Sequence, residues 1–148
     1  MPRFRFRLQA VLEHREMVEE ERQRSVAALE RERVRLEDAI RACQRSIERE
    51  RDELRSGLGG GDIRGAKLQS AAMLRFITDA QRHVLELAGV LKRLERARAA
   101  LLEAATARKA VELLRERQLS EWRSAERRAE ASETDELAVM RAGRKVDP

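Results

Sequence analysis

The stretch Gly57-Leu58-Gly59-Gly60-Gly61-Asp62 divides the chain near its middle. Together with Gly65 it holds five of the seven glycines, and each glycine inside a helix costs roughly 1 kcal/mol relative to alanine. The two prolines stand at positions 2 and 148, so nothing else between them forces a helix to end. Asp62 is of a residue type that caps the start of a helix. We therefore predict an all-α fold, a long antiparallel two-helix coiled-coil hairpin with its turn in this stretch.

Apolar residues recur at coiled-coil spacings on both sides of the glycine-rich stretch. Before it, the seam comprises Val26, Leu29, Leu36, Ile40, Cys43, Ile47 and Leu54. After it, the seam comprises Met73, Ile77, Ala80, Val84, Leu87, Leu91, Leu94 and Leu101. We expect one coiled-coil domain over residues 1–148, with helix one at about 4–56, the turn at 57–65 and helix two at about 66–142. The short turn favours an intramolecular hairpin, and hence a monomer.

Composition limits the classes of protein to which the chain can belong. Of its 148 residues 40% are charged and 3% are aromatic, so it can bury a narrow seam but not a thick globular core. The net charge of +5 arises from 32 basic and 27 acidic residues, a balance that does not demand nucleic acid. The single cysteine, Cys43, fits a reducing compartment. No apolar stretch is long enough to span a bilayer, so we expect a cytoplasmic protein that reaches a membrane only through other proteins.

The sequence offers no pattern for catalysis, for a metal or for a cofactor. Gly59-Gly60-Gly61 is not followed by Gly-Lys-Ser/Thr, as a phosphate-binding loop requires, and reads as a turn. His14 and His83 are the only histidines, and no spacing of histidine and cysteine suits a metal. We expect no enzymatic activity and no cofactor.

Basic and aromatic residues alternate at the N-terminus, which an antiparallel hairpin brings to the same end as the C-terminus. The expected open tip comprises Arg3, Phe4, Arg5, Phe6, Arg7, Leu8, Val11, Arg141 and Arg144. Such a tip suits docking into a protein ring or groove at least as well as it suits single-stranded nucleic acid or a membrane surface. The plain structural alternative is a helix end with an apolar stripe and snorkelling arginines.

A second candidate surface lies on helix two, where Phe76, Ala80, His83 and Leu87 follow one another along one face. Phe76 and His83 each stand one place before a seam residue, so they can flank the seam and stay partly exposed. The pattern leaves open whether this stripe is a contact surface or part of the seam.

Several short motifs, in order, resemble those of the flagellar type III export protein family FliJ. They include Phe4-Arg5-Phe6-Arg7-Leu8, Arg75-Phe76-Ile77, Glu121-Trp122-Arg123 and Asp135-Glu136-Leu137-Ala138. The resemblance covers nearly the whole chain.

The resemblance implies a monomeric stalk similar to the gamma subunit of rotary ATPases. Its open end would insert into the hexameric export ATPase, and Phe76, with the matching positions Ala80, His83 and Leu87, would meet the cytoplasmic part of the export gate membrane protein. It further implies binding of export chaperones, a role in flagellum assembly, and a place at the cytoplasmic face of the inner membrane through the export apparatus.

Three other functions remain open at this point. The nearest is the equivalent stalk of a virulence type III secretion system, which shares the architecture. A basic coiled coil that binds nucleic acid would lose affinity steeply as salt rises. A homodimeric spacer would have no use for a glycine-rich turn in mid-chain.

Overall fold

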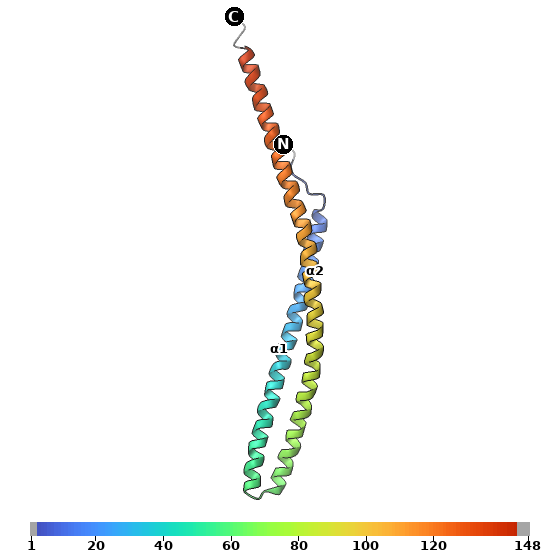
Figure 1. The fold of residues 1–148 in the computed structure, drawn as a ribbon, viewed down its shortest axis with the longest axis vertical. Coiled ribbons are helices and arrows are strands. Elements are labelled where there is room, and N and C mark those ends of the chain that lie inside the picture. The colour runs from blue at the N-terminus through green and yellow to red at the C-terminus, as the bar shows by residue number, and fades with distance from the viewer. Residues whose placement is uncertain (1–2, 145–148) are drawn as a thin grey trace. The chain divides into compact units, whose positions relative to one another are not determined.

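The computed structural model describes residues 3–144, which form two helices, α1 at Gln9–Gly59 and α2 at Ile63–Arg144 (Figure 1). These residues contain no strand, and the two helices pack against each other. The predicted all-α hairpin is therefore confirmed. Residues 1–2 and 145–148 of the expected domain lie outside the described part. Neither helix has a stretch apolar and long enough to cross a membrane, as far as residues 3–144 go.

The turn between the helices is narrower than the glycine-rich stretch and is built from backbone hydrogen bonds. The amide of Asp62 donates to the carbonyl of Gly57 at 2.9 Å, and the amide of Gly61 donates to the carbonyl of Leu58 at 3.3 Å. With a φ of +82° at Gly61, this is the Schellman ending of a helix. On the other side, the Asp62 carboxylate accepts a hydrogen bond from the amide of Gly65 at 2.9 Å, the predicted cap of α2.

Two glycines in the turn should respond to alanine in opposite directions. Gly61→Ala is expected to lower the free energy of unfolding by about 1–2 kcal/mol, because L residues are strained at positive φ. Gly59→Ala is expected to raise it by up to about 1 kcal/mol, because Gly59 is helical and a Cβ there meets nothing within 4 Å. Urea unfolding followed by circular dichroism measures both. Equal effects of the two substitutions would contradict this account of the turn.

The expected start of helix one at about residue 4 is wrong, because α1 begins at Gln9. Residues 3–8, here called the N-terminal segment, are not helical. Along it Arg3, Arg5 and Arg7 are exposed while the rings of Phe4 and Phe6 are half-buried. Alternation with a period of two belongs to an extended backbone and not to a helix.

The chain divides into two compact units, each containing part of α1 and part of α2. Whether it behaves as one domain stays a prediction. The unit formed by residues 20–102 has its core at Leu36, Val90 and Leu94, which are 0%, 1% and 2% exposed. All seven predicted seam residues of α1 are buried or half-buried in this unit.

Six of the eight predicted seam residues of α2 are buried or half-buried, namely Met73, Ile77, Ala80, Leu87, Leu94 and Leu101. However, Val84 is 51% exposed and Leu91 is 47% exposed, while their preceding neighbours His83 and Val90 are half-buried and buried. Two heptad lines one residue apart share every second member, so both satisfy the spacing rule and only packing against α1 separates them.

Arg33, which stands between the seam residues Leu29 and Leu36, is half-buried and is neutralised by neighbouring carboxylates. The Arg33 guanidinium donates hydrogen bonds to Glu30 at 2.8 Å and to Glu37 at 2.9 Å. The bond from Arg33 is the main cause that holds the pKa of Glu30 below its ordinary value. Arg98 on α2 pairs with the same Glu30, so a polar cluster joins the two helices at this level.

The second unit, described for residues 3–19 and 103–144, has a smaller core. Leu12 and Ala104 are 3% and 8% exposed. Arg108 on α2 pairs with Glu19 on α1 and with Glu112. The bond to Glu19 is the main cause that raises the pKa of Arg108. This ion pair joins α1 to α2 in the unit.

Candidate functional site

The N-terminal segment lies against α2 through its first aromatic ring. The rings of Phe4 and Trp122 are 6.0 Å apart between centroids and tilted by 52°. This geometry is favourable for an aromatic pair and contributes about 0.5–1.5 kcal/mol beyond the area it buries. Trp122 therefore holds the segment against α2. The contact lies well before the C-terminal end of α2 at Arg144.

A groove runs between the N-terminal segment and α2. Its lining comprises Phe4, Arg5, Phe6, Arg7, Gln9 and Arg115. The lining contains three arginines and no acidic residue. With the exposed Arg3, these arginines form what is here called the N-terminal basic cluster: Arg3, Arg5, Arg7 and Arg115.

The N-terminal basic cluster gathers four arginines that have no internal counter-ion. Arg108, Arg117 and Arg33 each form an ion pair with glutamate. Within residues 3–144, no member of the cluster forms one. Four unpaired guanidinium groups around half-buried aromatic rings leave a surface ready for an acidic partner.

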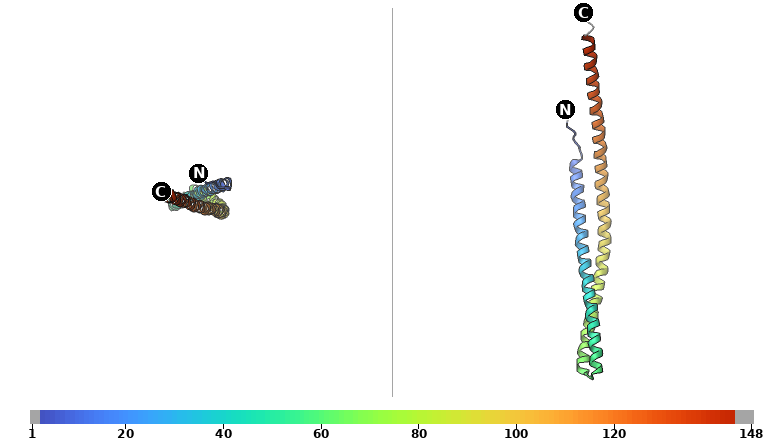
Figure 2. Two further views of the ribbon diagram at one scale, coloured as in Figure 1. Left: turned by 90° about the horizontal axis from the view of Figure 1, so that it is seen from above. Right: turned by 90° about the vertical axis from the view of Figure 1, so that its left-hand side faces the viewer.

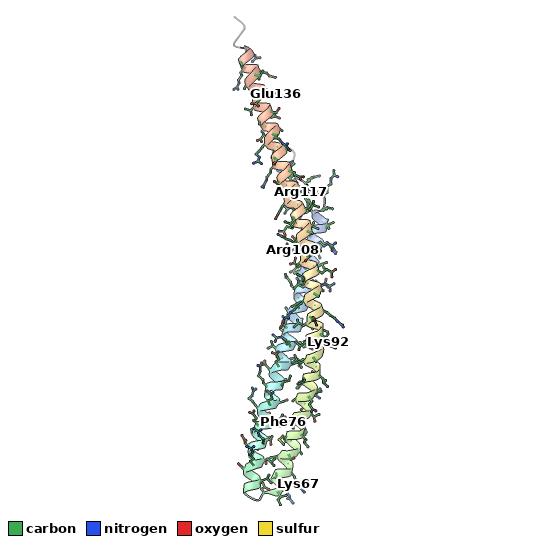
Figure 3. The ribbon with its side chains drawn as sticks, viewed as in Figure 1. Lys67, Phe76, Lys92, Arg108, Arg117 and Glu136 are labelled. Carbon is green, nitrogen blue, oxygen red and sulfur yellow. The ribbon has the colours of Figure 1, made fainter. Side chains whose placement is uncertain are left out.

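The structure does not gather all the residues of the predicted tip. The N-terminal segment lies beside the part of α2 that carries Arg115 and Trp122. Leu8 belongs to this segment, and the exposed Val11 follows it. Arg141 follows Trp122 by 19 residues, which is about 28 Å along a helix, and Arg144 lies one turn further. Figure 2 shows α2 continuing past the N-terminal segment, and Glu136 in Figure 3 stands on that continuation. The expected single tip is thus two separate surfaces.

Sequence reasoning missed the α2 side of the N-terminal surface, namely Arg115 and Trp122. Their partners on the N-terminal segment were assigned to a helix that would have run on to residue 4. Reading the alternation of arginine and phenylalanine as extended backbone would have ended α1 earlier and placed the segment beside α2. Leu12, which is buried, was also missed. The helical spacing from Phe4 and Leu8 pointed to its neighbour Val11, which is 39% exposed.

The second candidate surface, called the gate stripe, comprises Phe76, Ala80, His83 and Leu87. All four are half-buried and lie on the observed seam line. Figure 3 shows Phe76 on the part of α2 near the turn. The Nδ1 atom of His83 is buried without a hydrogen-bond partner, and the nearest carboxylate oxygen, on Glu86, is 3.8 Å away. Each of the four stripe residues keeps part of its side chain accessible, while the covered part faces the seam.

An apolar groove flanks the gate stripe within the same unit. Its lining comprises Ile40, Gln44, Ile47, Ile77, Ala80, Gln81, Val84 and Leu85. Ile77, Val84 and Leu91 repeat every seven residues along this flank, where two-helix coiled coils usually carry charged residues. Elsewhere in the unit polar pairs join the two helices, with Arg93 and Glu32 3.7 Å apart and Gln69 donating to Glu53 at 3.2 Å. One flank of the unit is therefore open and apolar, as a surface that receives a partner would be.

Comparison with known proteins adds one finding. A family model described as Flagellar FliJ protein matches residues 4–147. No curated protein and no solved structure matches the chain. The matched range includes both candidate surfaces except Arg3. Among the described residues, no group of three or more histidine, cysteine, aspartate or glutamate side chains could hold a metal ion.

Proposed function

The chain belongs to the flagellar FliJ family, whose members are flagellar export-related proteins, and from this premise we propose that it is a non-enzymatic stalk and adaptor of the flagellar type III export apparatus. It binds the hexameric export ATPase, the cytoplasmic part of the export gate membrane protein, and export chaperones. It acts at the cytoplasmic face of the inner membrane, to which these partners bring it, and it promotes export during flagellum assembly.

The observation that carries the proposal is the N-terminal surface. Phe4 and Trp122 fix the N-terminal segment against α2, and the arginines beside them have no internal counter-ion. Preorganised, exposed charge speeds docking and selects the partner. We assign the segment with Leu8 and Val11 to the ATPase ring. Arg141 and Arg144 are proposed as a second, separate ring contact on the continuation of α2.

Co-purification from native cytosol tests the proposal. The tagged chain is expected to recover a hexameric ATPase of the flagellar export system. Recovery of an ATPase from a virulence secretion system would assign the chain to that apparatus. Recovery of nucleic acid that is lost as salt rises, with no ATPase, would overturn the proposal.

The second contact, with the export gate, is proposed on α2 near the turn. The gate stripe supplies the accessible edges of Phe76, His83 and Leu87. Ala80 belongs to both the stripe and the apolar groove, so a partner that reaches one also meets the other. The exposed side chains of Val84 and Leu85 then extend the contact. The same open flank is the proposed position for export chaperones, whose docking would compete with the gate.

Alanine substitutions at Val84 and Phe76 should separate contact from core. Val84→Ala is expected to weaken binding to the purified cytoplasmic part of the gate several-fold and to change the free energy of unfolding by less than about 0.5 kcal/mol, because the side chain is exposed. Phe76→Ala is expected to lower both, because its ring is half-buried against α1. Calorimetric titration and urea unfolding measure the two effects.

The matched control is Leu113→Ala, another exposed apolar residue of α2 outside this unit. It should leave gate binding as it is. If Val84→Ala binds the gate as tightly as Leu113→Ala does, the contact does not extend onto the open flank.

A further inference from the structure

The chemistry of the N-terminal surface narrows the kind of segment that it can bind. The exposed side chains of Arg3 and Arg5 flank the half-buried ring of Phe4, and exposed Arg7 follows Phe6 at the start of the turn that leads into α1. Residues two apart on an extended backbone are about 6–7 Å apart. Carboxylates at alternate positions of another extended chain have the same spacing. Arg115 adds a fourth cation from α2, across the groove from the segment.

The backbone of the segment is also available. The carbonyl of Phe6 accepts a hydrogen bond from the amide of Gln9 at 3.2 Å, and this is the one backbone bond found for residues 3–6 within the described chain. An extended segment with unpaired amide and carbonyl groups can take a second extended chain alongside it. Side chains at alternate positions of that chain then face the arginines.

The aromatic rings decide between peptide and nucleic acid. Single-stranded nucleic acid has a phosphate spacing that would also suit the arginines of the segment, but its proteins stack bases on exposed aromatic faces. Here Phe4 packs on Trp122, and Phe6 is half-buried in the groove lining. The rings are therefore used to hold the segment in place, and charge is what remains for recognition.

We propose that the N-terminal basic cluster binds an acidic segment of a partner protein in an extended conformation, with carboxylates at alternate positions meeting Arg5 and Arg7 and with Arg115 closing the groove from α2. The inference deepens the proposed docking to the ATPase ring and rests on it only for the identity of the partner. The chemistry of the ligand, an acidic extended peptide, is inferred from the residues of the groove alone.

The test uses the purified full chain and three fluorescent probes of equal charge. One is a peptide with glutamate at alternate positions, one carries the same glutamates in a single block, and one is an oligothymidylate. Fluorescence anisotropy is expected to show tightest binding of the alternating peptide. The triple variant Arg5→Glu/Arg7→Glu/Arg115→Glu should bind it at least about tenfold more weakly, because three attractive contacts become repulsive.

A second triple variant controls for net charge. Arg22, Arg31 and Arg35 are exposed and form no ion pair within the described residues, so Arg22→Glu/Arg31→Glu/Arg35→Glu changes the total charge equally. It should bind the alternating peptide within about twofold of the unaltered chain. Equal losses in both variants, tighter binding of the oligothymidylate, or equal binding of the two peptides would each overturn the inference.

The two proposals fail in different ways. If the ATPase co-purifies with the chain but the alternating peptide does not bind, the inference is wrong and the proposed function stands. If the peptide binds in the arginine-dependent way but no ATPase is recovered, the basic cluster has the stated chemistry and the assigned partner is wrong.

Discussion

Replacing Leu36 with alanine is expected to lower the free energy of unfolding by about 2–5 kcal/mol. Leu36 is 0% exposed, and the facing helix contributes the buried Val90 and Leu94 to the same core. Leu36 and Val90 are the only large side chains of the described residues that are fully buried. A two-helix seam has no third element that could move in to fill the cavity, so the loss should lie in the upper part of this range.

Val34 supplies the control, because it stands two residues away on the same helix and is 45% exposed. Val34→Ala should change the free energy of unfolding by less than about 0.5 kcal/mol, as most exposed substitutions do. Urea unfolding followed by the helical circular dichroism signal measures both variants. Similar losses for the two would mean that the unit does not have its core where the structure places it.

The fold could be predicted because its decisive signals are local. A run of glycines ends a helix wherever it occurs, and Asp62 caps the next helix through its own neighbour Gly65. The stretch was expected to interrupt the helices over 57–65, yet α1 runs through Gly59 and α2 resumes at Ile63. Glycine lowers helix propensity without forbidding the helix, and one residue at positive φ was enough to turn the chain.

The seam of α2 could not be settled from spacing alone. Ile77, Val84 and Leu91 are more apolar as a set than Phe76, His83 and Val90, and the members of each set lie seven residues apart. Burial of His83 rather than Val84 depends on how the facing residues of α1 pack, which is a property of two segments distant in sequence. The line of Ile77, Val84 and Leu91 forms the open flank instead of the seam. The residues that made the seam prediction ambiguous are therefore the ones that form a candidate surface.

The N-terminal surface was half predictable. Its basic and aromatic residue types were recognised, but their conformation was not, because Phe4, Leu8 and Val11 also match a helical stripe. The alternation of arginine and phenylalanine was the better signal. The greater length of α2 separates Arg141 from the segment, and the predicted helix bounds already implied this difference in length.

Deleting residues 1–8 is expected to weaken binding to the purified export ATPase by about a hundredfold or more. The deletion removes three of the four arginines of the N-terminal basic cluster and both rings that position them. A loss of that size corresponds to about 2.7 kcal/mol, which is within the range carried by a few central aromatic and arginine residues at an interface. Helical content should stay unchanged, because α1 begins only at Gln9.

A substitution on the other side of the groove separates the contact residues from their support. Trp122→Ala leaves every arginine of the cluster in place but removes the ring on which Phe4 packs. Its expected effect is therefore smaller, about tenfold, because the segment must be ordered again when the partner binds. Surface plasmon resonance with immobilised ATPase measures both variants, and circular dichroism checks their helicity.

If the deletion binds as tightly as the full chain, the ring contact does not lie at the N-terminal segment, and the continuation of α2 with Arg141 and Arg144 becomes the surface to alter. If Trp122→Ala alone abolishes binding, the tryptophan itself contacts the partner and the segment is its cover.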